Sequence, residues 1–182
     1  MNTRKIIGNI GVGAILLLLA FTFVLFFYPA LSPLYSVEGA DSSVFKLMGQ
    51  VILKGKVPYL DIFDHKGPLL YFIEAIGLLI GERSGLFVLA VIALFVSIIC
   101  WYKSARIFLT PLKSAIVVGA QLLTYYYMRT TCNVSEDWNL PFISIAFCIL
   151  LSYITNRERQ NILFNGFVIG FCMDCSFFIR PN

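Results

Sequence analysis

The most regular feature of the chain is a series of long apolar segments separated by short polar ones. A helix needs about 20 apolar residues to cross a bilayer, and five of these segments are that long or nearly so. The expected spans cover residues 9–31, 86–102, 112–128, 139–155 and 162–179. The pattern therefore predicts an all-α, polytopic membrane protein of about five transmembrane helices, forming a single domain over residues 1–182.

A sixth apolar segment, residues 68–80, is the ambiguous one. It holds roughly a dozen apolar residues around Glu74, which is shorter than a span usually needs. We expect an interfacial or re-entrant helix here. The alternative, that this segment crosses the bilayer, would move every later loop to the other side.

The loop between the first span and this segment, residues 32–67, contains an amphipathic pattern at 43–54. Its apolar positions recur at helical spacing, with polar positions on the opposite side. The apolar positions are Val44, Leu47, Met48, Val51 and Ile52. Such a helix lies in the membrane interface. Asp41 or its serine neighbours stand where they could cap it, which would hold Asp41 near the membrane surface.

Composition rules out a soluble globule. Hydrophobic residues make up 59% of the chain and charged residues only 13%, with a mean hydropathy of +0.83, whereas soluble domains are about a quarter charged. The basic residues form short clusters between apolar segments, unlike a patch interleaved with aromatics, so we expect no nucleic-acid partner. Four of the five cysteines lie in apolar segments, and no disulfide framework is implied.

The basic clusters indicate topology, because cytoplasmic loops are enriched in Lys and Arg. The clusters are Arg4 and Lys5; Lys103, Arg106 and Lys113; and Arg157 and Arg159. All three face the cytoplasm if residues 68–80 do not cross. The N-terminus is then cytoplasmic and both acid-bearing loops are external.

The densest group of chemically active side chains lies in the first external loop. Asp61, Asp64, His65 and Lys66 occur within a few residues of each other, ahead of Gly67-Pro68. These side chains could form part of a site. The alternative is that the cations anchor at lipid headgroups and the acids are merely solvated.

Two further acidic positions are candidates. Glu136 and Asp137 lie in the second external loop, where the alternative role is to favour the N-terminus of the helix that begins near Leu140. Asp174 is an intramembrane carboxylate and so a functional candidate. An ion pair with Arg180, about a turn and a half away, explains it equally well.

The order of these features resembles a known family. After Asp41 comes a stretch that reads Gly55-x-x-Pro58-Tyr59-x-Asp61-x-Phe63-Asp64-His65-Lys66-Gly67-Pro68-Leu69-x-Tyr71, and the chain closes with Arg180-Pro181-Asn182. This order is similar to the N-terminal half of bacterial membrane glycosyltransferases of the C superfamily, the group of protein O-mannosyltransferases and aminoarabinose transferases. The resemblance covers nearly the whole chain, and Asp-His-Lys-Gly-Pro is its most specific part.

The resemblance implies sugar transfer from a polyprenyl-phosphate donor to an acceptor at the external face of a bacterial plasma membrane. Asp41 matches the catalytic base and Lys66 the cation near the donor phosphate. The substrate-binding positions would be Asp61, Asp64, His65, Lys66, Glu136 and Arg180. Glu136 matches an acid that helps to hold a divalent cation in some relatives, so Asp41 and Glu136 are the candidate ligands for Mg or Mn. Many relatives have Asp-Glu where this chain has Asp41-Ser42.

Members of that family usually continue for several more helices, so the resemblance implies a truncated or split gene product or a fragment, and a second polypeptide is one possible source of the missing half. The competing hypotheses are a small transporter or assembly subunit and an inactive membrane-inserted remnant. A transporter needs polar groups near the bilayer midplane. The expected spans offer little there beyond Gln121, which favours the transferase.

Overall fold

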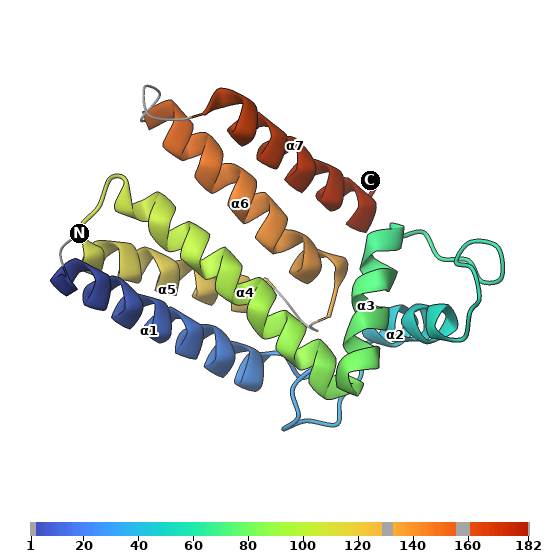
Figure 1. The fold of residues 1–182 in the computed structure, drawn as a ribbon. Coiled ribbons are helices and arrows are strands. Elements are labelled where there is room, and N and C mark those ends of the chain that lie inside the picture. Colours follow the sequence, from blue (N-terminus) through green and yellow to red (C-terminus); the bar gives the residue numbers. More distant parts are fainter. Residues whose placement is uncertain (1–2, 129–132, 156–160, 182) are drawn as a thin grey trace.

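The computed structural model describes residues 3–128, 133–155 and 161–181, with side chains from Ile10 onward. Across these ranges the chain forms seven α-helices and no β-strand (Figure 1). They are α1 (Thr3–Phe27), α2 (Ala40–Leu53), α3 (Pro68–Gly81), α4 (Arg83–Arg106), α5 (Pro111–Tyr127), α6 (Ser135–Thr155) and α7 (Ile162–Ile179). The predicted all-α fold is confirmed. Cys132, Arg157, Arg159 and the side chains of Arg4 and Lys5 lie outside the described part.

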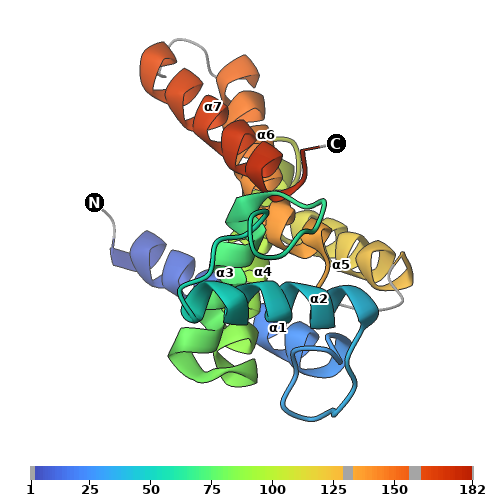
Figure 2. The ribbon, with the colours of Figure 1, turned by 90° about the vertical axis from the view of Figure 1, so that its right-hand side faces the viewer.

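The five long helices lie side by side, and α2 and α3 gather at one end of them (Figure 1). Helix α4 is central, since it packs against α1, α3, α5 and α6, while α7 packs against α6 and α3. Figure 2 looks at the end that carries α2 and α3, and shows α2 running across the long helices. We call this the α2–α3 end. It also contains the C-terminus of α7 and the first turns of α4 and α6.

Four of the helices are long and apolar enough to cross a membrane. They are residues Ile10–Phe27, Arg83–Arg106, Ser135–Thr155 and Ile162–Ile179. The fifth expected span, α5, has 17 residues and is shorter than these four. Helix α1 ends at Phe27 instead of residue 31, because Pro29 disfavours helical backbone at the residue before it. Helix α6 begins at Ser135, four residues earlier than expected.

The amphipathic helix exists, but it packs through only part of the predicted apolar side, since Met48 is buried and Val51 and Ile52 are half-buried. Its buried positions are Ser42, Phe45, Met48 and Gly49. Val44 and Leu47 from the predicted apolar side are 43% and 47% exposed. The reason is a close crossing with α3, where a Cβ at Gly49 would lie 2.9 Å from the Ala75 backbone nitrogen. The predicted side-chain cap is also wrong, since Gly39 is the N-cap and Asp41 lies in the first turn.

Helix α3 turns back abruptly into α4. Gly81 ends α3, Glu82 adopts a φ of 53°, and Arg83 begins α4. The two helices pack tightly, because a Cβ at Gly85 would lie only 2.0 Å from the carbonyl oxygen of Gly77. Helix α3 therefore sits beside the first turns of α4 instead of running parallel to the long helices, an arrangement that fits an interfacial helix.

Candidate functional site

The loop that carries the Asp-His-Lys-Gly-Pro stretch is held in shape by its own hydrogen bonds. Asp61 Oδ2 accepts from the Val57 backbone N–H at 2.7 Å. The Tyr59 hydroxyl, at a residue with a φ of 68°, donates to the Lys66 carbonyl at 2.6 Å. Asp61 therefore closes a turn in its own loop, which is a structural use of a carboxylate that we expected to bind substrate.

Asp64 is the best-held acid of this loop. Its Oδ2 accepts from the Tyr71 hydroxyl of α3 at 2.7 Å, and its Oδ1 accepts from the His65 backbone N–H at 2.8 Å. The side chain of Asp64 is only 12% exposed, whereas that of His65, whose Nδ1 lies 3.0 Å from Oδ1, is 66% exposed. Burial, followed by the hydrogen bond to Asp64, raises the pKa of the Tyr71 hydroxyl. The loop thus presents His65 outward from a fixed carboxylate.

Lys66 is positioned through its backbone. Its carbonyl accepts from Tyr59, and its N–H donates to the Tyr71 hydroxyl oxygen at 3.2 Å. Within the described part of the chain, no carboxylate pairs with the Lys66 ammonium. The ammonium is therefore available to a ligand.

A direct backbone contact joins this loop to the end of α7. The Gly67 N–H donates to the Ile179 carbonyl at 3.0 Å, and a Cβ at Gly67 would lie 2.0 Å from the Phe178 carbonyl oxygen. Only glycine fits such an approach. Arg180, the next residue, forms an ion pair with Glu136 at the start of α6. Lys66, Arg180 and Glu136 are thus brought to one region of the α2–α3 end.

Asp41 lies near the same region, because the next residue, Ser42, is hydrogen-bonded toward α6. The Ser42 hydroxyl accepts from the Asn133 amide at 2.9 Å, and the Asn133 Oδ1 accepts from the Trp138 indole N–H at 2.9 Å. This buried chain of bonds ties the first turn of α2 to the first turn of α6, where Glu136 lies. Asp41 itself is exposed, and in the described residues it forms no hydrogen bond or ion pair with the other candidates.

Glu74 of α3 is buried at this end of the molecule, which the sequence analysis did not predict. The side chain is fully buried, and neither carboxyl oxygen has a hydrogen-bond partner within the described chain. Asn133 and Trp138 lie near it but bond each other, as given above. Burial raises the pKa of Glu74 from 4.5 to about 8, against the nearby Lys46 charge. A charged residue in a short apolar helix was the available signal.

Asp137 has a structural role as well. Its Oδ1 accepts from the Tyr28 hydroxyl at 3.0 Å and from the Tyr125 hydroxyl, and its Oδ2 accepts from the Val134 N–H at 2.9 Å. It therefore connects α1, α5 and α6 at the α2–α3 end. The alternative ion pair of Asp174 with Arg180 is not formed, since Arg180 pairs with Glu136 and Asp174 is exposed.

The residues present do not fit a divalent-cation site. Among the described side chains, no three of His, Cys, Asp and Glu are grouped to hold a metal ion. Of the two predicted ligands, Glu136 is already paired with Arg180. We derive no step through a metal.

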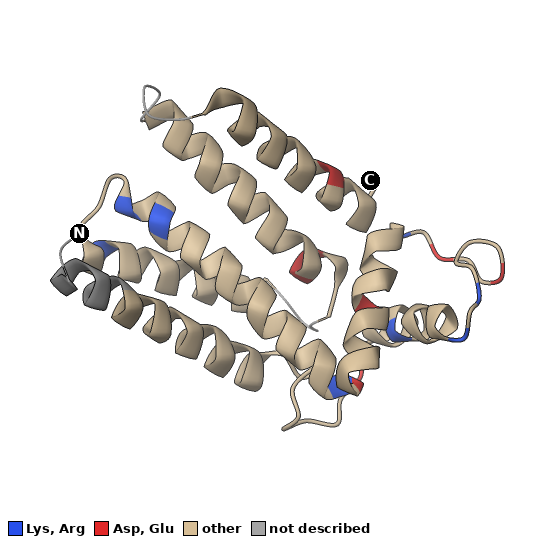
Figure 3. Cartoon of the chain, in the orientation of Figure 1, with Lys and Arg blue, Asp and Glu red and all other residues tan. Residues whose placement is uncertain are grey.

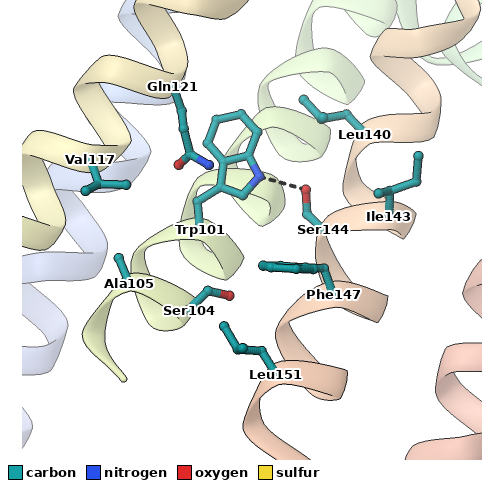
Figure 4. A pocket seen from close by; sticks show the side chains of 10 residues that line it. All are labelled: Trp101, Ser104, Ala105, Val117, Gln121, Leu140, Ile143, Ser144, Phe147 and Leu151. Carbon is teal, nitrogen blue, oxygen red and sulfur yellow. Dashed lines mark hydrogen bonds between the residues drawn. The ribbon is translucent and has the colours of Figure 1, made fainter. Parts of the chain in front are cut away.

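A separate groove of about 330 Å³ lies between α4, α5 and α6, and its lining includes the polar side chains of Gln121, Ser104 and Ser144. In Figure 4 the Gln121 side chain lies beside the Trp101 ring, and the Trp101 indole N–H donates to the Ser144 hydroxyl at 2.9 Å. The groove is otherwise mainly apolar, with Ile143, Phe147 and Leu151 on its α6 side.

Together, the fold and this cluster describe a helical chain with four candidate spans and a polar site at one end. Its sequence matches the family described as "Putative competence-induced protein Ccs4 N-terminal domain" over residues 9–182, and the chain belongs to that family. No curated protein and no solved structure matches it.

Proposed function

We propose that this chain is a polytopic protein of a bacterial plasma membrane, with the α2–α3 end external and the N-terminus cytoplasmic. Four helices of spanning length support membrane insertion. The orientation is supported by charge: Figure 3 shows Lys and Arg on α4 and α5 at the far end from α2 and α3, and no acid there in the described residues, whereas the α2–α3 end carries both acids and bases. Cytoplasmic segments carry the excess of Lys and Arg. Helix α5 would be a fifth, short span.

The proposed activity is transfer of a sugar from a polyprenyl phosphate to an acceptor hydroxyl at that external end. The observation that carries it is the contact of Gly67 with Ile179, which brings the Lys66 loop beside the Arg180–Glu136 pair. Cations from two distant segments then lie at one site beside the membrane surface. The sequence resemblance to C-superfamily glycosyltransferases supports the same activity.

In the proposed reaction, Asp41 takes the proton of the acceptor hydroxyl as its oxygen attacks the anomeric carbon of the sugar. The bond from that carbon to the phosphate oxygen breaks, and polyprenyl phosphate leaves with the electron pair. Lys66 stabilises the charge that develops on this phosphate, and Arg180 adds to the positive field. Asp64 and His65 would contact sugar hydroxyls. The exposure of Asp41 supports these roles, as does the lack, among described side chains, of a carboxylate paired with Lys66.

The test is an in vitro assay with undecaprenyl-phosphate-linked radiolabelled sugars and the purified chain in a lipid bilayer. We expect release of undecaprenyl phosphate, reduced at least about a hundredfold in Asp41→Asn, as is typical for removal of a general base. Lys66→Met should lose a comparable factor. The matched controls, Asp174→Asn and Lys54→Gln, should keep wild-type rates. Turnover that is unchanged in Asp41→Asn and Lys66→Met contradicts the assignment.

The transporter or assembly-subunit alternative is favoured by one observation, the groove that holds Gln121, Trp101 and Ser144. Polar side chains between apolar helices are typical of a substrate path. Two results together would favour this alternative. The wild type would transfer no sugar, and its solute flux into proteoliposomes would fall in Gln121→Leu.

A further inference from the structure

A second groove lies between α1 and α4, at the end of the long helices opposite the α2–α3 end. Its volume is about 620 Å³, within the range of about 300–1,000 Å³ usual for ligand sites. Its apolar lining includes Val12, Gly13, Leu16 and Ile99, and Lys103 and Arg106 line it from the last turn of α4.

The two cations that line this groove have N–H donors without a partner in the described part of the chain. Lys103 and Arg106 are both exposed, and they are three residues apart, so they lie on one face of α4. In the described part of the chain, Lys103 has no hydrogen bond or ion pair, and Arg106 donates only to the Leu109 carbonyl. Among the residues that the structure describes, no acid lines the groove. The groove therefore offers two uncompensated positive charges beside an apolar surface.

We propose that this groove binds one anionic phospholipid of the adjacent leaflet. The lipid phosphate would pair with Lys103 and Arg106, and one acyl chain would lie along Val12, Gly13 and Leu16. Basic pockets between transmembrane helices bind anionic headgroups in this way. The proposal needs membrane insertion but is independent of the proposed sugar transfer.

A phospholipid fits better than a free phosphate. The cations lie at the end of a span, where headgroups are expected, and the apolar residues continue from them toward hydrocarbon depth. A soluble anion would use only the charged end and leave the apolar groove unfilled. A membrane lipid uses both parts at once.

The first test measures retention of phosphatidylglycerol and phosphatidylcholine by the purified chain, with native mass spectrometry during lipid titration. Each Lys or Arg near a headgroup contributes about 1 kcal/mol, so Lys103→Gln with Arg106→Gln should weaken phosphatidylglycerol binding about 30-fold. Lys113→Gln, at the same end but outside the lining, should change it less than about threefold. Equal binding by the double variant and the control would overturn the proposal.

The second test separates the groove from its charges. A Cβ at Gly13 meets nothing within 4 Å, so leucine fits there without a clash and fills the groove. Gly13→Leu should reduce binding of both lipids with unchanged helical circular dichroism. Gly11→Leu, also in open space but outside the lining, should not. Unchanged binding in Gly13→Leu, or displacement of phosphatidylglycerol by millimolar inorganic phosphate, would refute the lipid assignment.

Discussion

Replacing Glu74 by glutamine should remove most of the pH dependence of this protein's stability. The carboxyl group is fully buried without a hydrogen-bond partner in the described chain, so it is far easier to bury when protonated. Lys46 is the nearby charge that favours the ionised form, and Glu38 opposes it. Burial is the largest effect and Glu38 acts with it, so the pKa rises from 4.5 to about 8 although Asn133, Lys46 and Trp138 favour the ionised form.

The direction in which stability changes with pH follows from proton binding. Between pH 4.5 and about 8 the folded chain holds a proton on Glu74 that the unfolded chain has released. The stability contributed by Glu74 is therefore fully present below pH 4.5, falls as the pH rises, and is lost above about 8. At about 1.4 kcal/mol for each pKa unit, the whole loss is at most about 5 kcal/mol, and about 4 kcal/mol of it lies between pH 5 and pH 9.

The assay is equilibrium unfolding in mixed micelles from pH 5 to pH 9, followed by tryptophan fluorescence. Glutamine keeps the shape of the side chain and stays neutral, so Glu74→Gln should be about 3 kcal/mol more stable than wild type at pH 7. Glu82→Gln, at an exposed acid of the same end, should follow the wild-type profile. Parallel pH profiles for wild type and Glu74→Gln would refute the argument from burial.

Three further changes test other contacts. Gly67→Ala should lower stability by about 2 kcal/mol, because its Cβ would collide with the α7 backbone, whereas Gly11→Ala meets nothing and should be neutral or stabilising in the same unfolding assay. Tyr28→Phe removes a hydroxyl donor to a buried carboxylate and should cost about 1–3 kcal/mol in that assay. Arg180→Gln and Glu136→Gln break a half-exposed pair, so each should change stability by less than about 1 kcal/mol while Arg180→Gln lowers sugar transfer. If either variant instead lowers the free energy of unfolding by several times this amount, the pair has a structural role.

The sequence predicted the helices well because long apolar segments have few alternatives. Their ends were harder to predict, and local chemistry explains the errors. Pro29 shortens α1, and the polar first turn of α6 was assigned to a loop although Asp137 accepts bonds from α1 and α5 there. The contact with Tyr28 joins residues 109 positions apart, and no local pattern reveals it.

The side of α2 that packs was predicted only in part, since Met48 is buried but Val44 and Leu47 are not. Hydrophobic periodicity favoured Val44 and Leu47, but small residues decide which face can approach α3, and Gly49 lies on the other side. In a membrane interface, apolar side chains have lipid as an alternative partner, so hydrophobicity alone does not identify the protein-facing side.

The sequence named candidate site residues, whose roles stay predictions, but it did not reveal how their segments are connected. Lys66, Glu136 and Arg180 were expected to face one side, and the structure adds the backbone contact at Gly67 that joins their segments. Asp61 closes its own loop, and Glu74 was noted only as an irregularity in a short helix.

The central claim is that the acids and cations of the α2–α3 end share one external membrane face. Single cysteines at Ser43, Ser84 and Pro181, all exposed at that end, and at Thr110, exposed at the opposite end, test it in a cysteine-free background. A membrane-impermeant thiol reagent applied to whole cells should label the first three and leave Thr110 unlabelled until the membrane is permeabilised. Labelling of Ser43 and Thr110 with protection of Ser84 and Pro181 would mean that α3 crosses the bilayer, and would contradict the shared site.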